Sequence, residues 1–355
     1  MTPVDPATIR RLVVRPPNWL GDAVLALPAI AAIRRHFPAA ALTIAAAPAV
    51  AALFRERTGV EPDQVMELPA ATPAAVAALR GGAFDLGVLL PNSFRSAWQL
   101  RRAGIGERWG FGTSGRWWLL TRVSRRAPRA KGRHQSDYYR ALVRGLDIEC
   151  DEALPALGAS DGSRERAHAL LAERGVPPGQ PLVVFAPGAA YGQAKQWPPD
   201  RVAEVIARVT TRLDAAVAIV GASHDRDAAR AIESWLRGQA PATRGRVVDL
   251  VGRTSLGALV GVAERSSVFV SNDSGAMHVA AALGRPVVAL FGPTDERATR
   301  PLGNHDVLTA RVFCRPCMLR DCPIDHRCMK RITVDHVYAA IERRLRAAAG
   351  GQASA

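Results

Sequence analysis

Short apolar runs and longer segments of helical periodicity alternate along almost the whole chain. The runs are rich in Val, Ile, Leu and Ala, and most are followed by a turn of small or polar residues. The longer segments repeat apolar residues every three or four positions, which is the spacing of one helix face. This alternation predicts parallel sheets with helices on both faces. The expected strands are residues 12–14, 41–46, 65–68, 84–90, 182–186, 216–220, 247–250, 267–270 and 287–291. The expected helices are residues 22–37, 49–58, 73–80, 93–103, 134–146, 163–174, 199–213, 224–237, 255–264, 276–283 and 333–346.

The strand-and-helix pattern is interrupted once, near the middle of the chain. Residues 151–162 are rich in Ala, Gly and Asp without a clear period, so we expect a linker there. A chain of 355 residues is long enough for two domains. We expect Rossmann-like domains at residues 1–160 and 161–332, followed by an amphipathic helix and a short tail at 333–355. Residues 107–134, rich in Gly, Arg and Trp, are expected to form an irregular surface loop.

The most informative segment, residues 266–295, predicts one strand–helix–strand unit. Its polar groups gather in the turn Asn272-Asp273-Ser274 and at His278, one helical turn later. A helix N-terminus at the carboxyl end of a parallel strand offers free N–H groups and a favourable dipole to a phosphate. The alternative is that Asp273 or Ser274 only caps the helix and that His278 is a satisfied core histidine. This segment alone leaves both interpretations open.

Two other loops that follow expected strands carry candidate chemistry. The loop after the first strand lacks the GxGxxG turn that a dinucleotide pyrophosphate needs. Asp22 stands at the start of the next helix, as a cap or as a general base. The loop at residues 187–197 contains the small residues Gly188 and Ala189 and, further on, Lys195. Small residues let a backbone approach a phosphate closely, and a lysine adds a compact positive charge.

Composition and charge narrow the class of protein. Contents of 48% hydrophobic and 22% charged residues are those of a globular protein. We see no signal peptide and no apolar run of about 20 residues, so we expect a cytoplasmic protein. The formal net charge is +15, and residues 95–133 contain eleven basic residues and one acidic residue, with aromatic residues between them. Such a segment suits nucleic acid, an anionic lipid headgroup, an acidic glycan or simple solvation, but it matches no nucleic-acid-binding module.

Two patterns could bind a metal ion. Asp225-Arg226-Asp227 matches the DxD pattern of many metal-dependent sugar transferases, although acidic residues at a helix start ordinarily serve the helix dipole. Four cysteines fall within fifteen residues, which is the density of a zinc or iron–sulfur site. Their spacing does not match a two-knuckle zinc pattern, and reduced structural cysteines are the alternative. The four are Cys314, Cys317, Cys322 and Cys328.

Five motifs, taken together and in order, make the chain similar to a known family. They are PNWLGDAVLALPAI, LLPNSFRSA, APGAAYGQAKQWP, SNDSGAMHVAAALGRPVVALFGPTD and CRPCMLRDCP. The combination resembles the ADP-heptose:lipopolysaccharide heptosyltransferases of glycosyltransferase family 9, and within it most closely the heptosyltransferase II group. The resemblance extends from about residue 12 to residue 337.

The resemblance implies a fold and a reaction. The fold is GT-B, an α/β architecture in which two Rossmann-like, doubly wound domains face each other across a cleft. The C-terminal domain takes the donor, the N-terminal domain takes the acceptor, and the last helix crosses back to the N-terminal domain. The reaction is inverting transfer of L-glycero-D-manno-heptose from ADP-heptose to the first inner-core heptose of Kdo-lipid A, in lipopolysaccharide core synthesis. No cofactor is required, and a structural metal at the cysteines is the one metal site to consider.

The resemblance also assigns residues, motif by motif. Asp22 is expected to be the catalytic base, and Lys195 is expected to contact the donor diphosphate. The other residues assigned to the donor site are Ala189, Thr254, Asp273, Ser274, Gly275 and His278. The residues assigned to the acceptor are Asn92, Ser93 and Arg95.

The anionic acceptor would give the basic segment at residues 95–133 a use. Kdo-lipid A lies at the membrane surface, so this segment would steer the acceptor and hold the enzyme reversibly at the cytoplasmic face of the inner membrane. Two alternatives within the family are another core position and another nucleotide sugar. A basic nucleic-acid-binding protein is a remote alternative, since the ordered sugar-transferase motifs give no reason to expect nucleic acid as a partner.

Overall fold

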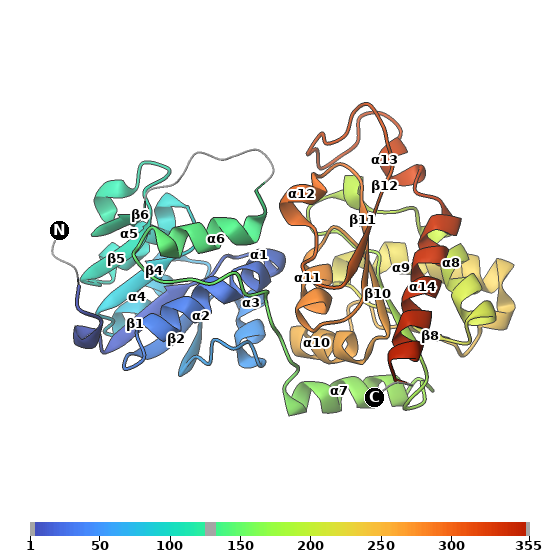
Figure 1. The fold of residues 1–355 in the computed structure, drawn as a ribbon, viewed down its shortest axis with the longest axis horizontal. Helices are drawn as coiled ribbons and strands as arrows, with labels where there is room; N and C mark the ends of the chain where they lie inside the picture. Colours follow the sequence, from blue (N-terminus) through green and yellow to red (C-terminus); the bar gives the residue numbers. More distant parts are fainter. Residues whose placement is uncertain (1–3, 125–132, 353–355) are drawn as a thin grey trace. The chain divides into compact units, whose positions relative to one another are not determined.

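The computed structural model describes residues 4–124 and 133–352, which fold into two compact units. The first unit is Met1–Leu157 and the second is Gly158–Ala355. Each is built on one six-stranded parallel sheet with helices on both faces (Figure 1). The α/β class and the doubly wound halves expected from the strand-and-helix alternation are therefore confirmed.

The first unit carries its six strands in the order β3-β2-β1-β4-β5-β6. The strands are β1 (Arg11–Arg15), β2 (Ala41–Ala46), β3 (Gln64–Glu67), β4 (Leu86–Leu89), β5 (Glu107–Phe111) and β6 (Arg122–Ser124). The helices are α1 (Leu20–Leu25), α2 (Leu27–His36), α3 (Pro48–Ala51), α4 (Thr72–Gly81), α5 (Phe94–Arg102) and α6 (Gln135–Arg144). Strand order reverses between β1 and β4, so the carboxyl ends of these two strands form the topological switch point, where ligands bind in open α/β sheets.

The second unit repeats this arrangement with its strands in the order β12-β11-β10-β7-β8-β9. The strands are β7 (Leu182–Ala186), β8 (Ala216–Ile219), β9 (Val247–Asp249), β10 (Val268–Asn272), β11 (Val287–Phe291) and β12 (His305–Thr309). The helices are α7 (Asp161–Ala172), α8 (Pro199–Arg212), α9 (Arg226–Gln239), α10 (Leu256–Arg265), α11 (Gly275–Ala282), α12 (Glu296–Thr299), α13 (Arg327–Lys330) and α14 (Val334–Gln352). Its switch point lies between β7 and β10, which pair with each other in parallel.

Helix burial follows the apolar spacing that predicted the helices. In α8, Val202, Val205, Ile206 and Val209 share one face and are buried in the core of the second unit. The last helix, α14, packs on α8 and on the β10–β12 side of the same sheet. The expected crossing of the last helix to the first domain stays a prediction. None of the helices within residues 4–124 and 133–352 has both the length and the apolarity to span a bilayer.

Two expectations about the first helix are corrected. The helix begins at Leu20 with Trp19 as its N-cap residue, so Asp22 lies in the first turn and is not the N-cap. The helix also breaks after Leu25, because Pro28 has no N–H to continue the hydrogen-bond ladder and fits only in the first turn of a new helix.

Residues 107–134 are not an irregular loop throughout, as the sequence suggested. They contain β5 and β6, which extend the parallel sheet, and a single turn at Trp117–Leu119. In β5, Trp109 and Phe111 are almost fully buried although arginine and glycine surround them in the sequence. Strand β12 was also missed, because this edge strand is only half-buried and is not an apolar run. Residues 125–132 of the basic segment lie outside the described residues.

Candidate active site

The loops after β7 and β10 are tied together by Asn272, the last residue of β10. Its side-chain amide donates to the carbonyl oxygen of Pro187 at 2.5 Å, and its side-chain oxygen accepts from the backbone N–H of Trp197 at 3.3 Å. The Asn272 side chain is buried, so these partners satisfy it where water cannot. The Pro187–Trp197 loop is therefore fixed at both ends against the switch point.

Lys195 and Asp273, 78 positions apart in the sequence, form a buried ion pair at this point. The Nζ of Lys195 lies 2.6 Å from Oδ2 of Asp273, and the two side chains are only 12% and 6% exposed. The hydroxyl of Thr294, which follows β11, donates to the same carboxylate oxygen at 2.7 Å. The Lys195 cation is therefore held in a defined place at the carboxyl ends of β7, β10 and β11. Thr294 was not predicted, and only its position after a strand could have suggested it.

The turn before α11 is not a simple cap. Ser274 is the N-cap residue, but its hydroxyl lies 3.0 Å from the hydroxyl of Ser271 and makes no cap hydrogen bond. Gly275 begins the helix, and His278 is buried one turn later. Asp273 binds Lys195 rather than the helix N–H groups. The capping alternative is therefore wrong for both Asp273 and Ser274, and the helix N-terminus keeps its capacity for an anion.

The other two residues assigned to the donor occupy different places. Ala189 is buried in the loop after β7, beside the Lys195 region. Thr254 precedes Ser255, the N-cap of α10, and follows β9. Because β7 and β8 lie between β9 and β10 in the sheet, Thr254 stands apart from the Lys195–Asp273 pair along the same carboxyl edge.

The DxD pattern serves the fold. Asp225 is buried, and its carboxylate accepts from the backbone N–H of Ala222 at 2.9 Å. A Cβ at Gly188 would lie only 2.2 Å from that carboxyl group, so Gly188 is needed to admit Asp225. Asp227 is exposed and pairs with Arg230. Across the described ranges, no group of three or more His, Cys, Asp or Glu side chains could hold a metal ion.

The absence of a metal-binding group among the described residues also concerns the four clustered cysteines. All four are free thiols; Cys328 is buried, Cys317 is exposed, and the other two are half-buried. They do not form one of the ligand groups that a metal ion would need, within the part of the chain that the structure describes. Burial raises the pKa of the Cys328 thiol, which favours its neutral form.

At the switch point of the first unit, Asp22 meets a tyrosine from α6. The hydroxyl of Tyr139 donates to Oδ1 of Asp22 at 3.2 Å, and the side-chain amide of Gln135 donates to the same hydroxyl at 3.2 Å. Burial and the neighbouring Asp22 carboxylate raise the pKa of Tyr139 above its ordinary value. Tyr139 therefore remains a protonated donor at neutral pH, which favours the charged form of Asp22.

The second loop of this switch point, after β4, carries the residues assigned to the acceptor. Ser93 caps α5 by accepting from the N–H of Ser96 at 3.2 Å. The side-chain amide of Asn92 donates to the hydroxyl of Tyr138. Tyr138 therefore links α6 to the loop after β4, and Tyr139 links it to the first turn of α1. Arg95 is exposed and donates to the carbonyl oxygen of Ala70. The tyrosine pair was missed, although the chain has only four tyrosines and two of them are adjacent.

Two buried arginines stand at the same edge. Arg15, the last residue of β1, donates to the side-chain oxygen of Gln99, and burial together with the nearby Arg95 lowers its pKa to about 10. Arg116 is fully buried and donates to carbonyl oxygens of the loop after β4, including that of Pro91 at 2.6 Å. Both remain protonated at neutral pH, so this edge of the first sheet is positively charged.

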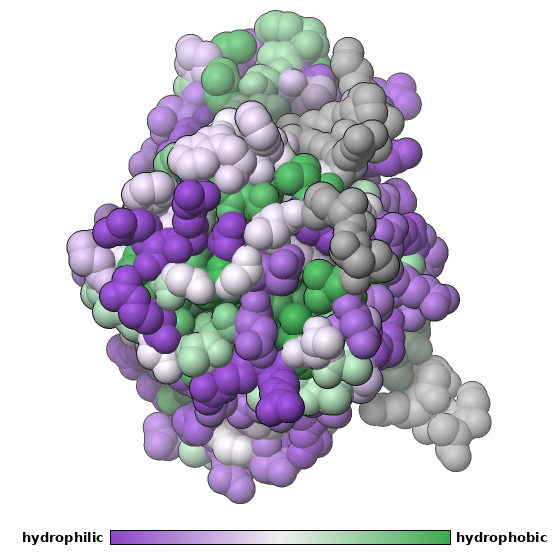
Figure 2. Space-filling view, turned by 90° about the vertical axis from the view of Figure 1, so that its left-hand side faces the viewer, coloured by the Kyte–Doolittle hydropathy of each residue, from purple (hydrophilic) through white to green (hydrophobic). Residues whose placement is uncertain are grey.

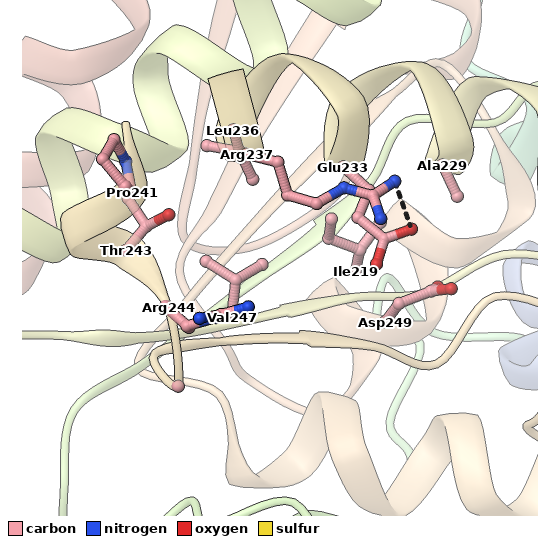
Figure 3. Close-up of a pocket in the computed structure, with 11 residues that line it drawn as sticks. Ile219, Ala229, Glu233, Leu236, Arg237, Pro241, Thr243, Arg244, Val247 and Asp249 are labelled. Carbon is pink, nitrogen blue, oxygen red and sulfur yellow. Dashed lines mark ion pairs between the residues drawn. The ribbon is translucent and has the colours of Figure 1, made fainter. Parts of the chain in front are cut away.

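A separate cavity of about 600 Å³ opens in the second unit between α9 and β9 (Figure 3). The ion pair between Arg237 and Glu233, at 3.8 Å, lies at its wall. None of the residues assigned to the donor site lines this cavity. It therefore lies apart from the Lys195–Asp273 pair.

Comparison with known proteins relates these sites to a family. Residues 74–327 match the family model of glycosyltransferase family 9 (heptosyltransferase). The chain is 30% identical over 312 residues to lipopolysaccharide heptosyltransferase 2 of Escherichia coli K12, covering 83% of this chain and 86% of that protein.

Two solved structures are similar over most of their length. The structure of E. coli ADP-heptose lps heptosyltransferase II superposes with a TM-score of 0.79 at 26% identity, covering 94% of this chain and 98% of that one. E. coli heptosyltransferase WaaC with ADP gives a TM-score of 0.68 at 20% identity, covering 94% and 99%. The fold is accordingly GT-B, as expected. Since the family match spans well over half of the sequence, the chain belongs to glycosyltransferase family 9 and is a glycosyltransferase.

Proposed function

We propose that the enzyme transfers L-glycero-D-manno-heptose from ADP-heptose to the first inner-core heptose of Kdo-lipid A, with inversion, in lipopolysaccharide core synthesis. The relative named heptosyltransferase 2 supports heptose as the transferred sugar and the lipopolysaccharide core as the acceptor. The observation that carries the proposal is the buried Lys195–Asp273 pair at a switch point beside the N-terminus of α11.

The second unit suits a nucleotide diphosphate for electrostatic reasons. The departing ADP carries its negative charge on the diphosphate, and a fixed cation with helix N–H groups stabilises that charge as the glycosidic bond breaks. Asp273 holds Lys195 in position, so little reorganisation is needed during the reaction. The structurally similar protein WaaC was solved with ADP, which is consistent with this class of donor.

The first unit supplies the base. In an inverting transfer, the acceptor hydroxyl oxygen bonds to the anomeric carbon while the bond from that carbon to the ADP oxygen breaks. The hydroxyl proton passes to a carboxylate, for which we propose Asp22. The hydrogen bond from Tyr139 keeps this carboxylate charged and oriented. The positive edge formed by Arg15, Arg95 and Arg116 suits an acceptor that carries anionic groups.

A donor and acceptor panel tests the proposal. Purified enzyme should transfer heptose from ADP-heptose to a mono-heptosylated Kdo-lipid A acceptor, and the anomeric configuration of the product should be opposite to that of the donor. A preference for a UDP- or GDP-sugar would overturn the donor assignment. Transfer only to Kdo-lipid A without heptose, or only to a di-heptosylated acceptor, would overturn the acceptor assignment.

Replacing Tyr139 by phenylalanine should shift the pH dependence of the reaction. Without the tyrosine hydroxyl, Asp22 loses a hydrogen bond that favours its charged form, so it becomes protonated at higher pH. The acid limb of the kcat/KM profile should move to higher pH by about 0.5–1 unit. The measurement is kcat/KM for the acceptor between pH 5 and about 9, the range over which a carboxylate base is first protonated and then fully charged.

Tyr338→Phe, on α14, is the matched control and should leave the profile in place. An unshifted acid limb in the Tyr139→Phe variant, with normal folding, would contradict the proposed link between Tyr139 and the base.

A patch of aromatic and arginine side chains on α5 and on the turn at Trp117–Leu119, which follows β5, supports contact with a membrane. We name Phe94, Trp98, Trp118, Arg101 and Arg102 the aromatic–arginine patch. Phe94 stacks on Trp98 at 6.3 Å between ring centroids, and Trp118 lies 6.1 Å from Phe94. Arg101 lies over Trp118 and Arg102 over Trp98. All three rings are exposed, and Figure 2 shows strongly hydrophilic and apolar residues side by side on a face of the first unit. Interfacial aromatic rings combined with arginines bind anionic lipid surfaces.

Replacing both Trp98 and Trp118 by serine should weaken binding to vesicles that contain anionic lipid. The loss of two interfacial rings should lower the partition coefficient at least about tenfold, measured by co-sedimentation. Phe313→Ser is the matched control, because Phe313 is also exposed and lies under an arginine, Arg327, but is outside the patch. Unchanged binding by the double variant, or equal wild-type binding to neutral vesicles, would overturn the proposed contact.

A further inference from the structure

The segment that carries the clustered cysteines, residues 314–328, lies against two loops of the candidate donor site. We name it the cysteine segment. The backbone N–H of Ala194, next to Lys195, donates to the carbonyl oxygen of Arg320 at 2.9 Å. The hydroxyl of Tyr191 donates to the carbonyl oxygen of Met318 at 3.0 Å. The N–H of Met318 in turn donates to Pro293, one residue before Thr294, at 2.9 Å. The segment thus bridges the loops after β7 and β11.

The loop after β7 is shaped to receive this segment. Gly192 has a φ of +156°, and a Cβ at this position would lie 2.5 Å from the carbonyl oxygen of Arg320. Both the backbone conformation and the close approach therefore require glycine. On the other side, Arg315 donates to the carbonyl oxygens of Gly292 at 2.6 Å and Thr294 at 3.1 Å. The cysteine segment is held in one position at the edge of the site.

This docking places a second cation beside Lys195. The Nζ of Lys195 lies 4.7 Å from the centroid of the Tyr191 ring, and the guanidinium carbon of Arg320 lies 5.1 Å from the same centroid. Lys195 is paired with Asp273. For Arg320, in contrast, no acidic side chain among the described residues lies within ion-pair distance. Two cations contact this ring, and only one carboxylate, that of Asp273, balances their charge. One positive charge is therefore left at this point.

We propose that Arg320 is a second cationic ligand of the donor diphosphate, so that the part of the cysteine segment around Arg320 borders the donor site. The inference rests on the proposed function, because it takes the Lys195 region as the place of the diphosphate. An arginine provides planar N–H donors that match phosphate oxygens, whereas Lys195 provides a point charge. A diphosphate carries enough negative charge to neutralise both cations. The ring of Tyr191 contacts both cations and so keeps them at the same point of the site.

Binding of ADP and of adenosine to the full-length protein, measured by calorimetry, tests the proposal. In the Arg320→Ala variant, ADP should bind about tenfold more weakly, because a charge-assisted hydrogen bond to phosphate is lost. Adenosine, which has no phosphate, should bind with unchanged affinity. Arg320→Lys should recover part of the loss, and the KM for the sugar donor should rise more than kcat falls.

Arg327→Ala is the matched control. Arg327 belongs to the same segment and lies over the Phe313 ring, but it is not among the cations on Tyr191. Equal ADP affinity in wild-type and Arg320→Ala protein would overturn the inference, and so would an equal loss for ADP and adenosine. If wild-type protein prefers another nucleotide, the donor assignment fails, and the same comparison is made with that nucleotide diphosphate and its nucleoside. The two proposals can therefore fail separately.

Discussion

Replacing Asp22 by asparagine is expected to lower kcat/KM for heptose transfer by about 100- to 10,000-fold, the usual contribution of a general base. Asparagine keeps the size of the side chain and an oxygen that can accept from Tyr139, so the first turn of α1 should remain intact. It cannot take the proton of the acceptor hydroxyl. The loss should appear mainly in kcat, measured with saturating ADP-heptose and acceptor.

Asp85→Asn is a suitable control for this variant. Asp85 accepts from the backbone N–H groups of Arg10 and Arg11, at the amino end of β1, whereas Asp22 follows the carboxyl end of the same strand. A carboxylate at that edge has no access to the switch point. Its removal should therefore leave kcat within about twofold of the wild-type value and lower the free energy of unfolding only slightly. A folded Asp22→Asn enzyme with near-normal turnover would show that another group accepts the proton.

Replacing Lys195 by alanine is expected to have the second large effect, a loss of about 100- to 1,000-fold in kcat/KM for the donor. The variant loses the cation that would stabilise the departing diphosphate. Among the described residues, it leaves the buried carboxylate of Asp273 with the hydroxyl of Thr294 as its remaining side-chain donor. Both changes disfavour an anionic ligand at this point. Steady-state kinetics with varied ADP-heptose measures the effect.

The chain offers a matched control in Lys330→Ala, because Lys330 is one of only three lysines and is exposed on α13. The double variant Lys195→Ala with Asp273→Asn separates charge from structure. If the pair acts as one unit, its loss should be clearly smaller than the sum of the two single losses in free energy. Donor kinetics unchanged in Lys195→Ala, with only a lower melting temperature, would assign the pair a purely structural role.

The sequence was most informative where apolar patterning and topology act together. Lys195 and Asp273 are far apart in the chain, but each follows a buried strand, and β7 and β10 are neighbours because strand order reverses between them. Parallel strands place such loops at the same edge of a sheet. The strand-and-helix alternation therefore predicted parallel sheets whose loops share one edge, whereas the strand order that makes β7 and β10 neighbours came from the structure.

The features that were missed depend on side-chain surroundings that cannot be inferred from the sequence alone. Trp109 in β5 is buried between polar neighbours in the sequence, so its strand has no apolar run. Tyr139 reaches Asp22 across 117 positions, and helical periodicity alone says only that it lies on a buried face of α6. Arg15 ends β1 one residue beyond the expected strand, and its burial beside Gln99 follows from how α5 covers the sheet. These contacts require the packed fold.

The close approach of Gly192 to the cysteine segment has an evolutionary consequence. A side chain at this position would collide with the backbone of Arg320, so any homologous enzyme that keeps the segment in this position must keep glycine there. A homologue whose segment was shortened or lost is released from that constraint, and larger residues can then be accepted. Glycine at this position and the presence of the segment should therefore be inherited together. Their joint occurrence across a family tree would record when this part of the protein was gained or lost.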